Sequence, residues 1–338
     1  MQKQVIMAIE TSCDETAVAL LSGGREILAN VISSQIDIHR QYGGVVPEIA
    51  SRHHLEQVNR LIDLALVEAG LTFSQVDALA VTYGPGLVGA LLVGVSTAKA
   101  LAYSLNLPLI GVNHIEGHIY ANWLVNTEIS FPLLCLIVSG GHTTLVRMDD
   151  HGKYQLLGQT KDDAVGEAYD KIARAMGLGY PGGPIIDKLA KEGYEKAFAF
   201  PRAWLGEGSY DFSFSGVKTA VLNHLNRAAQ RGESINKADL AASFQASVIE
   251  VLVEKTIQAS NKFKIDSIML AGGVAANSYL REQLASRCLR EGKGLSYPPL
   301  EYCTDNAAMI ACAAHYRLQK GERADWHLNA IPNLRLFG

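Results

Sequence analysis

Short apolar runs separated by polar tips are the main pattern along this chain. The apolar runs come in two pairs, residues 5–9 with 17–21 and residues 133–138 with 145–148. Polar or glycine-rich segments, residues 10–16 and 139–144, join the members of each pair. Two apolar runs around a short polar segment predict a β-hairpin. Because the second hairpin repeats the plan of the first, we expect an internally duplicated α/β fold with two lobes.

Glycine-rich turns follow one further predicted strand in each half. Residues 78–82 lead into the turn 83–86 and a helix to about position 103, and residues 267–271 lead into the turn 272–277 and a second helix. Glycine lets backbone N–H groups approach a ligand closely, and the N-terminus of the following helix favours an anion. Such turns are also ordinary α/β connections. Together with the two hairpin tips, they favour a phosphate- or nucleotide-like ligand in a cleft between lobes.

His114 and His118 form the sharpest chemical signal in the sequence. They are four positions apart, so on a helix they share one face and both imidazoles can reach a single ion. Such pairs also arise by chance, and two imidazoles leave a divalent ion short of ligands. The best third candidate is Asp305, just before a predicted helix of residues 307–315, although a residue there can also simply cap that helix. Two histidines and a carboxylate suit Fe(II) or Zn(II).

The same segment argues against a zinc protease. In H-E-x-x-H proteases the glutamate directly follows the first histidine, whereas here Ile115 holds that place and Glu116 comes next. At ~100° per helical residue, Glu116 points roughly opposite to the direction midway between the two histidines. We therefore expect that Glu116 does not activate a metal-bound water.

Composition narrows the protein class further. Hydrophobic residues make up 48% and charged residues 19% of the chain, so a large core can form and global disorder is excluded. A formal charge of −4, with no run of Lys or Arg, gives no compositional sign of nucleic-acid binding. Five cysteines without a C-x-x-C pair indicate free, buried thiols in a reducing cytosol. The sequence shows neither a signal-peptide pattern nor a membrane span, so we expect a cytoplasmic protein without membrane contact.

Eight motifs resemble those of one known family. They are residues 9–16 (IETSCDET), 42–54 (YGGVVPEIASRHH), 83–86 (YGPG), 113–118 (NHIEGH), 138–143 (VSGGHT), 166–171 (GEAYDK), 212–218 (FSFSGVK) and 271–277 (AGGVAAN). They resemble the universal tRNA threonylcarbamoyltransferase family, called TsaD in bacteria. The resemblance runs from about residue 6 to residue 314 and includes the positions of the two histidines and Asp305.

The resemblance implies a duplicated, two-lobed actin/Hsp70/sugar-kinase (ASKHA) fold with an inter-lobe cleft. The expected parts are an N-terminal lobe of residues 1–108, a C-terminal lobe of residues 109–320 with the metal and adenylate site, and a tail of residues 321–338. The resemblance also implies transfer of the threonylcarbamoyl group from L-threonylcarbamoyl-adenylate to N6 of adenosine 37, in tRNAs that read ANN codons, with release of AMP. The implied partners are tRNA, a paralogous ASKHA-fold subunit (TsaB-like) and a small P-loop ATPase subunit (TsaE-like).

The resemblance assigns the site residues as well. One divalent ion per subunit, Fe(II) favoured and Zn(II) possible, would be held by His114, His118 and Asp305. The adenylate would be held by Ile137, Val138, Ser139, Gly140, Gly141, Asp170, Gly183, Asp187 and Asn277. No catalytic base is named. Members of this family once carried the label O-sialoglycoprotein endopeptidase, which the position of Glu116 argues against. An ATPase of the same fold and a nucleotide-binding scaffold subunit stay open as alternatives.

Overall fold

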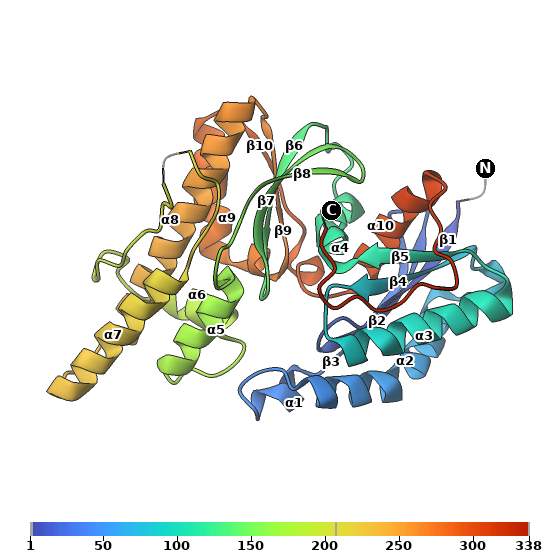
Figure 1. The fold of residues 1–338 in the computed structure, drawn as a ribbon, viewed down its shortest axis with the longest axis horizontal. Coiled ribbons are helices and arrows are strands. Elements are labelled where there is room, and N and C mark those ends of the chain that lie inside the picture. Colours follow the sequence, from blue (N-terminus) through green and yellow to red (C-terminus); the bar gives the residue numbers. More distant parts are fainter. Residues whose placement is uncertain (1–2, 207, 337–338) are drawn as a thin grey trace. The chain divides into compact units, whose positions relative to one another are not determined.

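Two compact units make up the chain (Figure 1). The computed structural model describes residues 3–206 and 208–336. Unit 1 comprises Met1–Ile129 together with Pro298–Gly338, and unit 2 comprises Ser130–Tyr297. This division differs from the expected boundary at residue 108, because β5 (Leu109–Asn113) pairs in parallel with β4 (Ala78–Gly84) and so belongs to unit 1. The chain also returns to unit 1 at Pro298, so the predicted metal residues lie in unit 1 and not in a C-terminal lobe.

The sheet of unit 1 has the strand order β3-β2-β1-β4-β5. Its first three strands are β1 (Val5–Glu10), β2 (Glu15–Ser22) and β3 (Glu26–Ser34). β1 runs antiparallel to β2 and parallel to β4, so it is the central strand and the first predicted hairpin is confirmed. A central strand covered on both faces is apolar throughout, and Ile6, Met7, Ala8 and Ile9 are all fully buried.

Helices cover both faces of this sheet. α2 (Pro47–Ala69) and α3 (Val88–Leu105) pack on one face, and α10 (Ala307–Gln319) packs on the other (Figure 1). α4 (His114–Tyr120) packs against α10. The remaining short elements are α1 (Ile36–Arg40) and the 3-10 turns η1 (Phe73–Gln75), η2 (Ala121–Leu124) and η4 (Leu300–Tyr302).

Local sequence signals explain the limits of α2. Pro47 stands at its first position, where a missing N–H costs nothing. Gly70 ends the helix with φ = 65°, a left-handed conformation that glycine adopts without strain. After α10, the C-terminal segment follows the open edge of the sheet, where the N–H of Ala324 donates to the carbonyl of Leu109 (2.8 Å) and that of Ile331 to Tyr83 (2.7 Å).

Unit 2 repeats the topology of unit 1. Its strand order is β10-β9-β6-β7-β8, in which β6 runs antiparallel to β7 and parallel to β9. The strands are β6 (Leu133–Val138), β7 (Thr143–Asp150), β8 (Lys153–Gln159), β9 (Ser267–Ala271) and β10 (Gly294–Ser296). β6 and β7 form the second predicted hairpin. The predicted duplication is therefore confirmed strand by strand.

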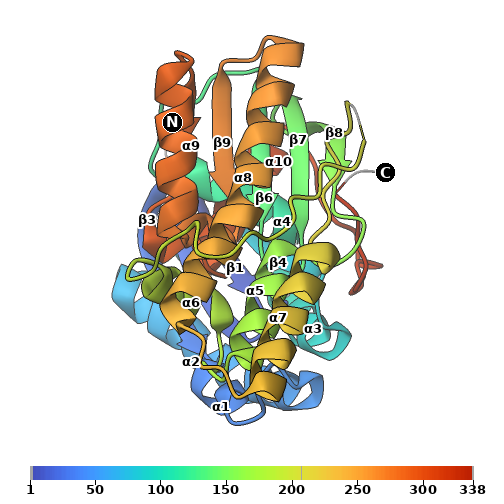
Figure 2. The same cartoon turned by 90° about the vertical axis from the view of Figure 1, so that its left-hand side faces the viewer.

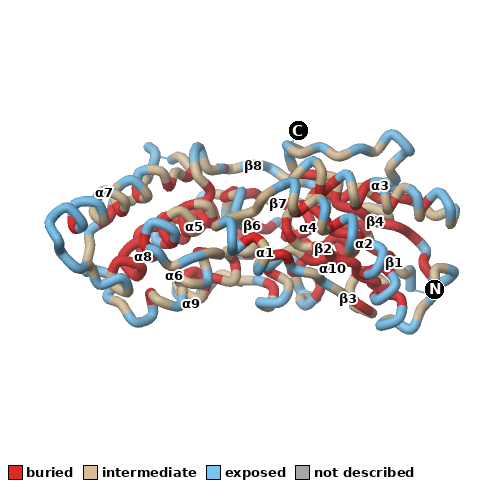
Figure 3. The backbone as a smooth tube through the Cα atoms, turned by 90° about the horizontal axis from the view of Figure 1, so that it is seen from below, coloured by how far each residue is buried: buried red, intermediate tan, exposed pale blue. Residues whose placement is uncertain are grey.

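The helices of unit 2 are centred on α8. They are α5 (Val165–Ala175), α6 (Gly182–Ala190), α7 (Ser215–Arg231), α8 (Lys237–Phe263) and α9 (Ser278–Arg290), with the 3-10 turn η3 (Gly273–Ala276) after β9. α6 and α9 both pack against α8 (Figure 2). The long α8 is buried over much of its length, as are the central strands of both sheets (Figure 3).

One described helix, α3, is long and apolar enough to cross a membrane by length and composition alone. It packs against β4 and α2, and its buried positions recur at helical spacing: Ala90, Leu91, Gly94, Val95, Ala98 and Ala102. A small-residue helix against a sheet has this composition without any membrane, so the finding is weak evidence for a span.

Candidate functional site

Helix α4 places both predicted histidine ligands on one side. β5 ends at Asn113, whose side-chain oxygen accepts hydrogen bonds from the N–H groups of Ile115 (2.9 Å) and Glu116 (3.4 Å) and so caps the helix. The rings of His114 and His118 lie 4.7 Å apart between centroids, at an angle of 81°. The prediction that the two histidines share a helix face is therefore confirmed.

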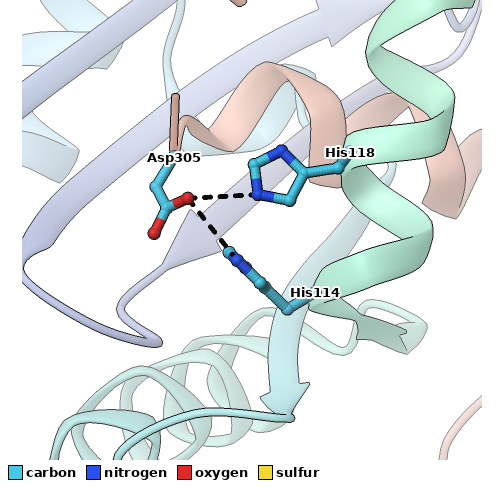
Figure 4. Close-up of side chains that lie close together, drawn as sticks. All are labelled: His114, His118 and Asp305. Atoms are coloured by element: carbon cyan, nitrogen blue, oxygen red, sulfur yellow. Dashed lines mark ion pairs between the residues drawn. The ribbon is translucent and has the colours of Figure 1, made fainter. Parts of the chain in front are cut away.

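Asp305 faces the two histidines (Figure 4). Its Oδ1 lies 3.2 Å from Nε2 of His118 and 3.5 Å from Nε2 of His114. The donor atoms of the three residues all lie within 4.8 Å of one another. Asn306, not Asp305, caps α10, because its side-chain oxygen accepts a hydrogen bond from the N–H of Met309 (3.0 Å). The alternative that Asp305 serves as the cap is therefore wrong.

The electrostatics around these side chains favour a cation. Burial lowers the pKa of His114, but the carboxylates of Asp305 and Glu10 raise it, to about 9. Burial raises the pKa of Asp305, but the two histidines lower it, to about 2. Burial and the negative charges of Asp305 and Asp14 raise the pKa of Glu15 to about 9. The raised pKa values of His114 and Glu15 reflect the negative charge of the neighbouring carboxylates, which a bound cation would neutralise.

The donor set fits a single divalent ion. Two imidazole nitrogens and one carboxylate oxygen are ligands that Fe(II) and Zn(II) accept. The two His–Asp separations, 3.2 and 3.5 Å, bracket the roughly 3.3 Å between two ligands that each lie about 2 Å from a tetrahedral ion. The structure thus brings together the three residues that the sequence predicted for one ion, as a group that could hold a metal.

Glu116 points away from this group. Its Oε2 lies 2.7 Å from both Nε and Nη2 of Arg317 on α10. The carboxylate is therefore engaged in an ion pair between α4 and α10. The predicted orientation of Glu116 is confirmed, which argues against proteolysis by this motif.

In unit 2, the predicted adenylate residues begin where β6 and β9 end. Ile137 and Val138 are the last residues of β6, and open space surrounds the positions where Gly140 and Gly141 would carry a Cβ. Gly272 directly follows β9 with φ = 92°, and a Cβ added there would lie 2.4 Å from the carbonyl oxygen of Val138. The two turns are therefore in close contact, an approach that glycine permits.

Helices α5 and α6 approach the same turns. The N–H of Gly166 on α5 donates to the carbonyl of Ser139 (3.2 Å). Asp170, one turn further along α5, accepts a hydrogen bond from the N–H of Gly182 at the start of α6 (2.7 Å). The neighbouring Gly183 also has open space at its Cβ position. The structure therefore gathers these predicted residues in one region of unit 2.

Asp187 and Asn277 have structural partners at the start of α9. The carboxylate of Asp187 accepts hydrogen bonds from the N–H (3.1 Å) and the hydroxyl (3.0 Å) of Ser278. The side-chain oxygen of Asn277 caps α9 through the N–H of Leu280 (2.8 Å), and its Nδ2 donates to Gln245 (2.8 Å). These bonds tie both side chains to the region around β6 and β9, and their contact with an adenylate stays a prediction.

Comparison with known proteins identifies the family. Residues 26–312 match the family model described as TsaD, tRNA N6-adenosine threonylcarbamoyltransferase. A protein of that name from Clostridium perfringens is 58% identical over 336 residues, which cover 99% of each chain. Another from Geobacillus kaustophilus is 60% identical over 333 residues, which cover 98% of this chain and 96% of the relative. The chain belongs to the TsaD family.

Solved structures support the fold of this TsaD-family chain. Full-length HypF superposes with a TM-score of 0.64 at 14% identity, over 96% of this chain and 47% of HypF, so the chain spans about half of that protein. Component A of (R)-2-hydroxyglutaryl-CoA dehydratase from Acidaminococcus fermentans gives a TM-score of 0.53 at 13% identity, over 95% and 99% of the two chains. At such identities the similarity is evidence for the fold alone, and the predicted duplicated ASKHA fold is confirmed.

Two residues of the TsaD motifs have roles that the sequence did not reveal. His54 is fully buried, with Nδ1 2.7 Å from the hydroxyl of Thr16 and Nε2 2.9 Å from the carbonyl of Cys13. It therefore holds the tip of the first hairpin. Glu10, at the end of β1, faces His114. The available signal for Glu10 was a carboxylate directly after the apolar run of residues 5–9, because such a side chain needs a partner when it is buried.

Proposed function

We propose that this chain transfers the threonylcarbamoyl group from L-threonylcarbamoyl-adenylate to N6 of adenosine 37 in tRNAs that read ANN codons, and releases AMP. The observation that carries the proposal is identity of 58–60% along nearly the whole chain to proteins named tRNA N6-adenosine threonylcarbamoyltransferase. In this reaction the N6 amine attacks the carbamoyl carbon, the bond from that carbon to the phosphate oxygen breaks, and the amine loses a proton. AMP is a good leaving group, so no covalent enzyme nucleophile is required.

We further propose that His114, His118 and Asp305 hold one divalent ion per subunit, with Fe(II) favoured and Zn(II) as the alternative. Such an ion, when bound, polarises a carbonyl or phosphoryl oxygen as a Lewis acid. The support is the partly buried donor group, in which the two His–Asp separations match those of ligands around one ion. The remaining task of the chain is orientation, since an adenine amine is a weak nucleophile and gains most from correct positioning.

Unit 2 is proposed to hold the adenylate. The open backbone at Gly140 and Gly141 suits a phosphate, because glycine N–H groups can approach its oxygens closely. Asp187 has carboxylate lone pairs beyond its two bonds to Ser278, and ribose hydroxyls can donate to them. Asp170, which anchors the start of α6, belongs to the same proposed site. Asn277 holds the turn after β9 in place. The other residues of the proposed site are Ile137, Val138, Ser139 and Gly183.

Partner proteins complete the proposed function. The formal charge of −4 offers little neutralisation of a tRNA backbone, so we propose that the chain binds tRNA together with a paralogous ASKHA-fold subunit and a small P-loop ATPase, in the cytoplasm. The neighbouring helices α2 and α3 expose large apolar side chains that a helical partner could cover. They are Leu55, Leu64, Val67, Val88, Leu92 and Tyr103.

The test is single-turnover transfer from synthetic labelled L-threonylcarbamoyl-adenylate to an ANN-decoding tRNA, with the partner subunits present. His114→Ala is expected to lose bound metal and at least 100-fold of the transfer rate, on the order expected when a metal centre is removed from an acyl transfer. His327→Ala, at an exposed position of the C-terminal segment, is the matched control and should label tRNA normally. An active His114→Ala protein with unchanged metal content would refute the metal assignment. No label with wild type, despite bound metal and adenylate, would favour an ATPase or a scaffold subunit.

A further inference from the structure

Glu10 lies directly behind one of the proposed metal ligands. It is the last residue of β1, and its side chain is fully buried. Its Oε1 accepts a hydrogen bond from the N–H of Ser12 (2.5 Å), and its Oε2 accepts one from the hydroxyl of Thr82 (2.5 Å). The same Oε2 lies 3.2 Å from Nδ1 of His114. The carboxylate is thus anchored by the tip of the first hairpin and by β4, and it is aimed at one ring nitrogen.

Both oxygens of Glu10 accept hydrogen bonds, one from the N–H of Ser12 and the other from the hydroxyl of Thr82. This is the bonding pattern of a carboxylate that carries no proton. An ionised carboxylate can only accept hydrogen bonds. The proton between Glu10 and His114 therefore belongs to Nδ1, which leaves the opposite nitrogen, Nε2, as the lone-pair donor on the ring. That nitrogen is the one that faces Asp305, at 3.5 Å.

The hydroxyl of Ser12 also contacts His114, but it does not determine which ring nitrogen carries the proton. Its hydroxyl lies 3.0 Å from Nδ1 of His114, but a hydroxyl can either donate or accept, so it fits both forms of the ring. The backbone around Ser12 is fixed by the glycine turn after β4: the N–H of Leu87 donates to its carbonyl (2.8 Å), and a Cβ on Gly86 would lie 2.5 Å from that oxygen. The anchored carboxylate is therefore the group that distinguishes the two tautomers.

We propose that Glu10 is a positioning residue that keeps the proton of His114 on Nδ1 and presents Nε2 to the divalent ion. The inference rests on the metal site proposed above. Metal-bound histidines commonly donate their second N–H to a carboxylate, which fixes the ring and strengthens the ligand. Nδ1 of His118, by contrast, is buried and has no hydrogen-bond partner among the described residues. Glu10 therefore acts on one of the two histidines only.

Glu10→Gln isolates this role. The carboxamide oxygen can still accept from Ser12, but its NH₂ group then faces His114 and favours the tautomer whose proton sits on Nε2, the ligand atom. Glu116→Gln is the matched control, because Glu116 is an equally buried carboxylate on the histidine helix and binds Arg317 instead of a histidine. Zn²⁺ affinity is measured by competition with a chromophoric chelator, and the site symmetry by the visible absorption of the Co²⁺-loaded protein.

Glu10→Gln is expected to weaken Zn²⁺ binding by about 10–100-fold and to change the Co²⁺ spectrum, as loss of a ligand-orienting carboxylate does. Glu116→Gln should lower thermal stability but bind Zn²⁺ within about 3-fold of wild type, which is the usual scatter for a residue outside the ligand shell. Equal Zn²⁺ affinity of wild type and folded Glu10→Gln would overturn the inference, and so would an equal loss in both variants. Failure of wild type itself to bind Zn²⁺ or Fe²⁺ would instead refute the proposed metal site.

A measurement on wild type covers the case in which Glu10→Gln does not fold. Long-range ¹H–¹⁵N correlation spectra of the Zn²⁺-loaded, ¹⁵N-histidine protein report which ring nitrogen carries the proton. A ring with protonated Nδ1 and ligated Nε2 is expected for His114, assigned by comparison with His114→Ala. Ligation through Nδ1 would overturn the inference, because Glu10 could then not accept a hydrogen bond from that nitrogen.

Discussion

The ion pair between Glu116 and Arg317 joins the two helices on which the metal group depends. Glu116 lies on α4 between the two histidines, and Arg317 lies on α10, which begins just after Asp305. Arg317→Met removes the guanidinium but keeps most of the aliphatic length of the side chain. It leaves the carboxylate of Glu116, only 1% exposed, without its cation. We expect this substitution to lower the free energy of unfolding substantially.

The burial of Glu116 and Arg317 determines how much each substitution lowers the free energy of unfolding. Removing one member of a buried pair costs about 3–5 kcal/mol when the remaining charge stays buried, which is the situation of Glu116 in Arg317→Met. The side chain of Arg317 is 28% exposed and retains a second partner in Glu322, at 2.9 Å. Glu116→Gln should therefore cost only about 1–2 kcal/mol. In the double variant no buried charge is left over, so it should be more stable than Arg317→Met alone.

Urea unfolding followed by tryptophan fluorescence measures these differences. Trp123 is 2% exposed and lies in η2, directly after α4, whereas Trp204 and Trp326 are 41% and 52% exposed. Replacing the two exposed tryptophans with phenylalanine in every variant makes Trp123 the only reporter, and it lies in unit 1. The reasoning would be refuted if Arg317→Met cost no more than Glu116→Gln, or if the double variant were less stable than Arg317→Met.

Two further predictions concern unit 2. Burial raises the pKa of Asp162, but hydroxyl and amide groups at the start of α7 lower it overall, so its stabilisation is present above the unfolded pKa of about 4 and is lost as the pH falls through the folded value. Asp162→Asn should lower the free energy of unfolding by about 1 kcal/mol at pH 7. In thermal melts, the difference in stability between wild type and this variant should disappear below about pH 4. A difference that does not change with pH would contradict the assignment. Lys255 donates to the carbonyls of Trp204 (2.9 Å), Ser209 (3.0 Å) and Asp211, so Lys255→Met should speed chymotrypsin cleavage after Trp204, and an unchanged rate would contradict this anchoring.

Elements with a strong local signal could be predicted from the sequence. β1 and β6 lie in the middle of their sheets and are covered on both faces. Such strands are apolar along their whole length, so their positions are visible in the sequence. The His114–His118 pair is visible because helical spacing fixes which side chains meet. Asp305 could be only a candidate, because nothing in the spacing shows that the chain returns to unit 1 after residue 297.

Features that depend on packing between distant segments could not be predicted. β3 and β8 are edge strands with partly exposed side chains, so neither has the continuous apolar pattern of the central strands. His54 lies among polar residues in the sequence of α2, which gives no sign that it is buried. It can be buried because the tip of the first hairpin supplies hydrogen-bond partners for both ring nitrogens. The division in the structure differs from the boundary expected at residue 108 for a similar reason, because the sequence does not show which sheet the strand after that position joins.

The two halves share one topology but have different chemistry at corresponding hairpin tips. β1 corresponds to β6, yet β1 ends in the buried carboxylate of Glu10, whereas β6 leads into Ser139 and two glycines with open space around them. A buried carboxylate held by a strand hydroxyl and by a backbone amide of the hairpin tip can orient a histidine beside it. A bare glycine turn exposes backbone N–H groups, which suit an anion. A duplicated scaffold therefore need not carry duplicated sites, because the strand ends only position the residues that occupy or follow them. In this chain the carboxylate at the end of β1 suits a cation, whereas the glycine turn after β6 suits an anion.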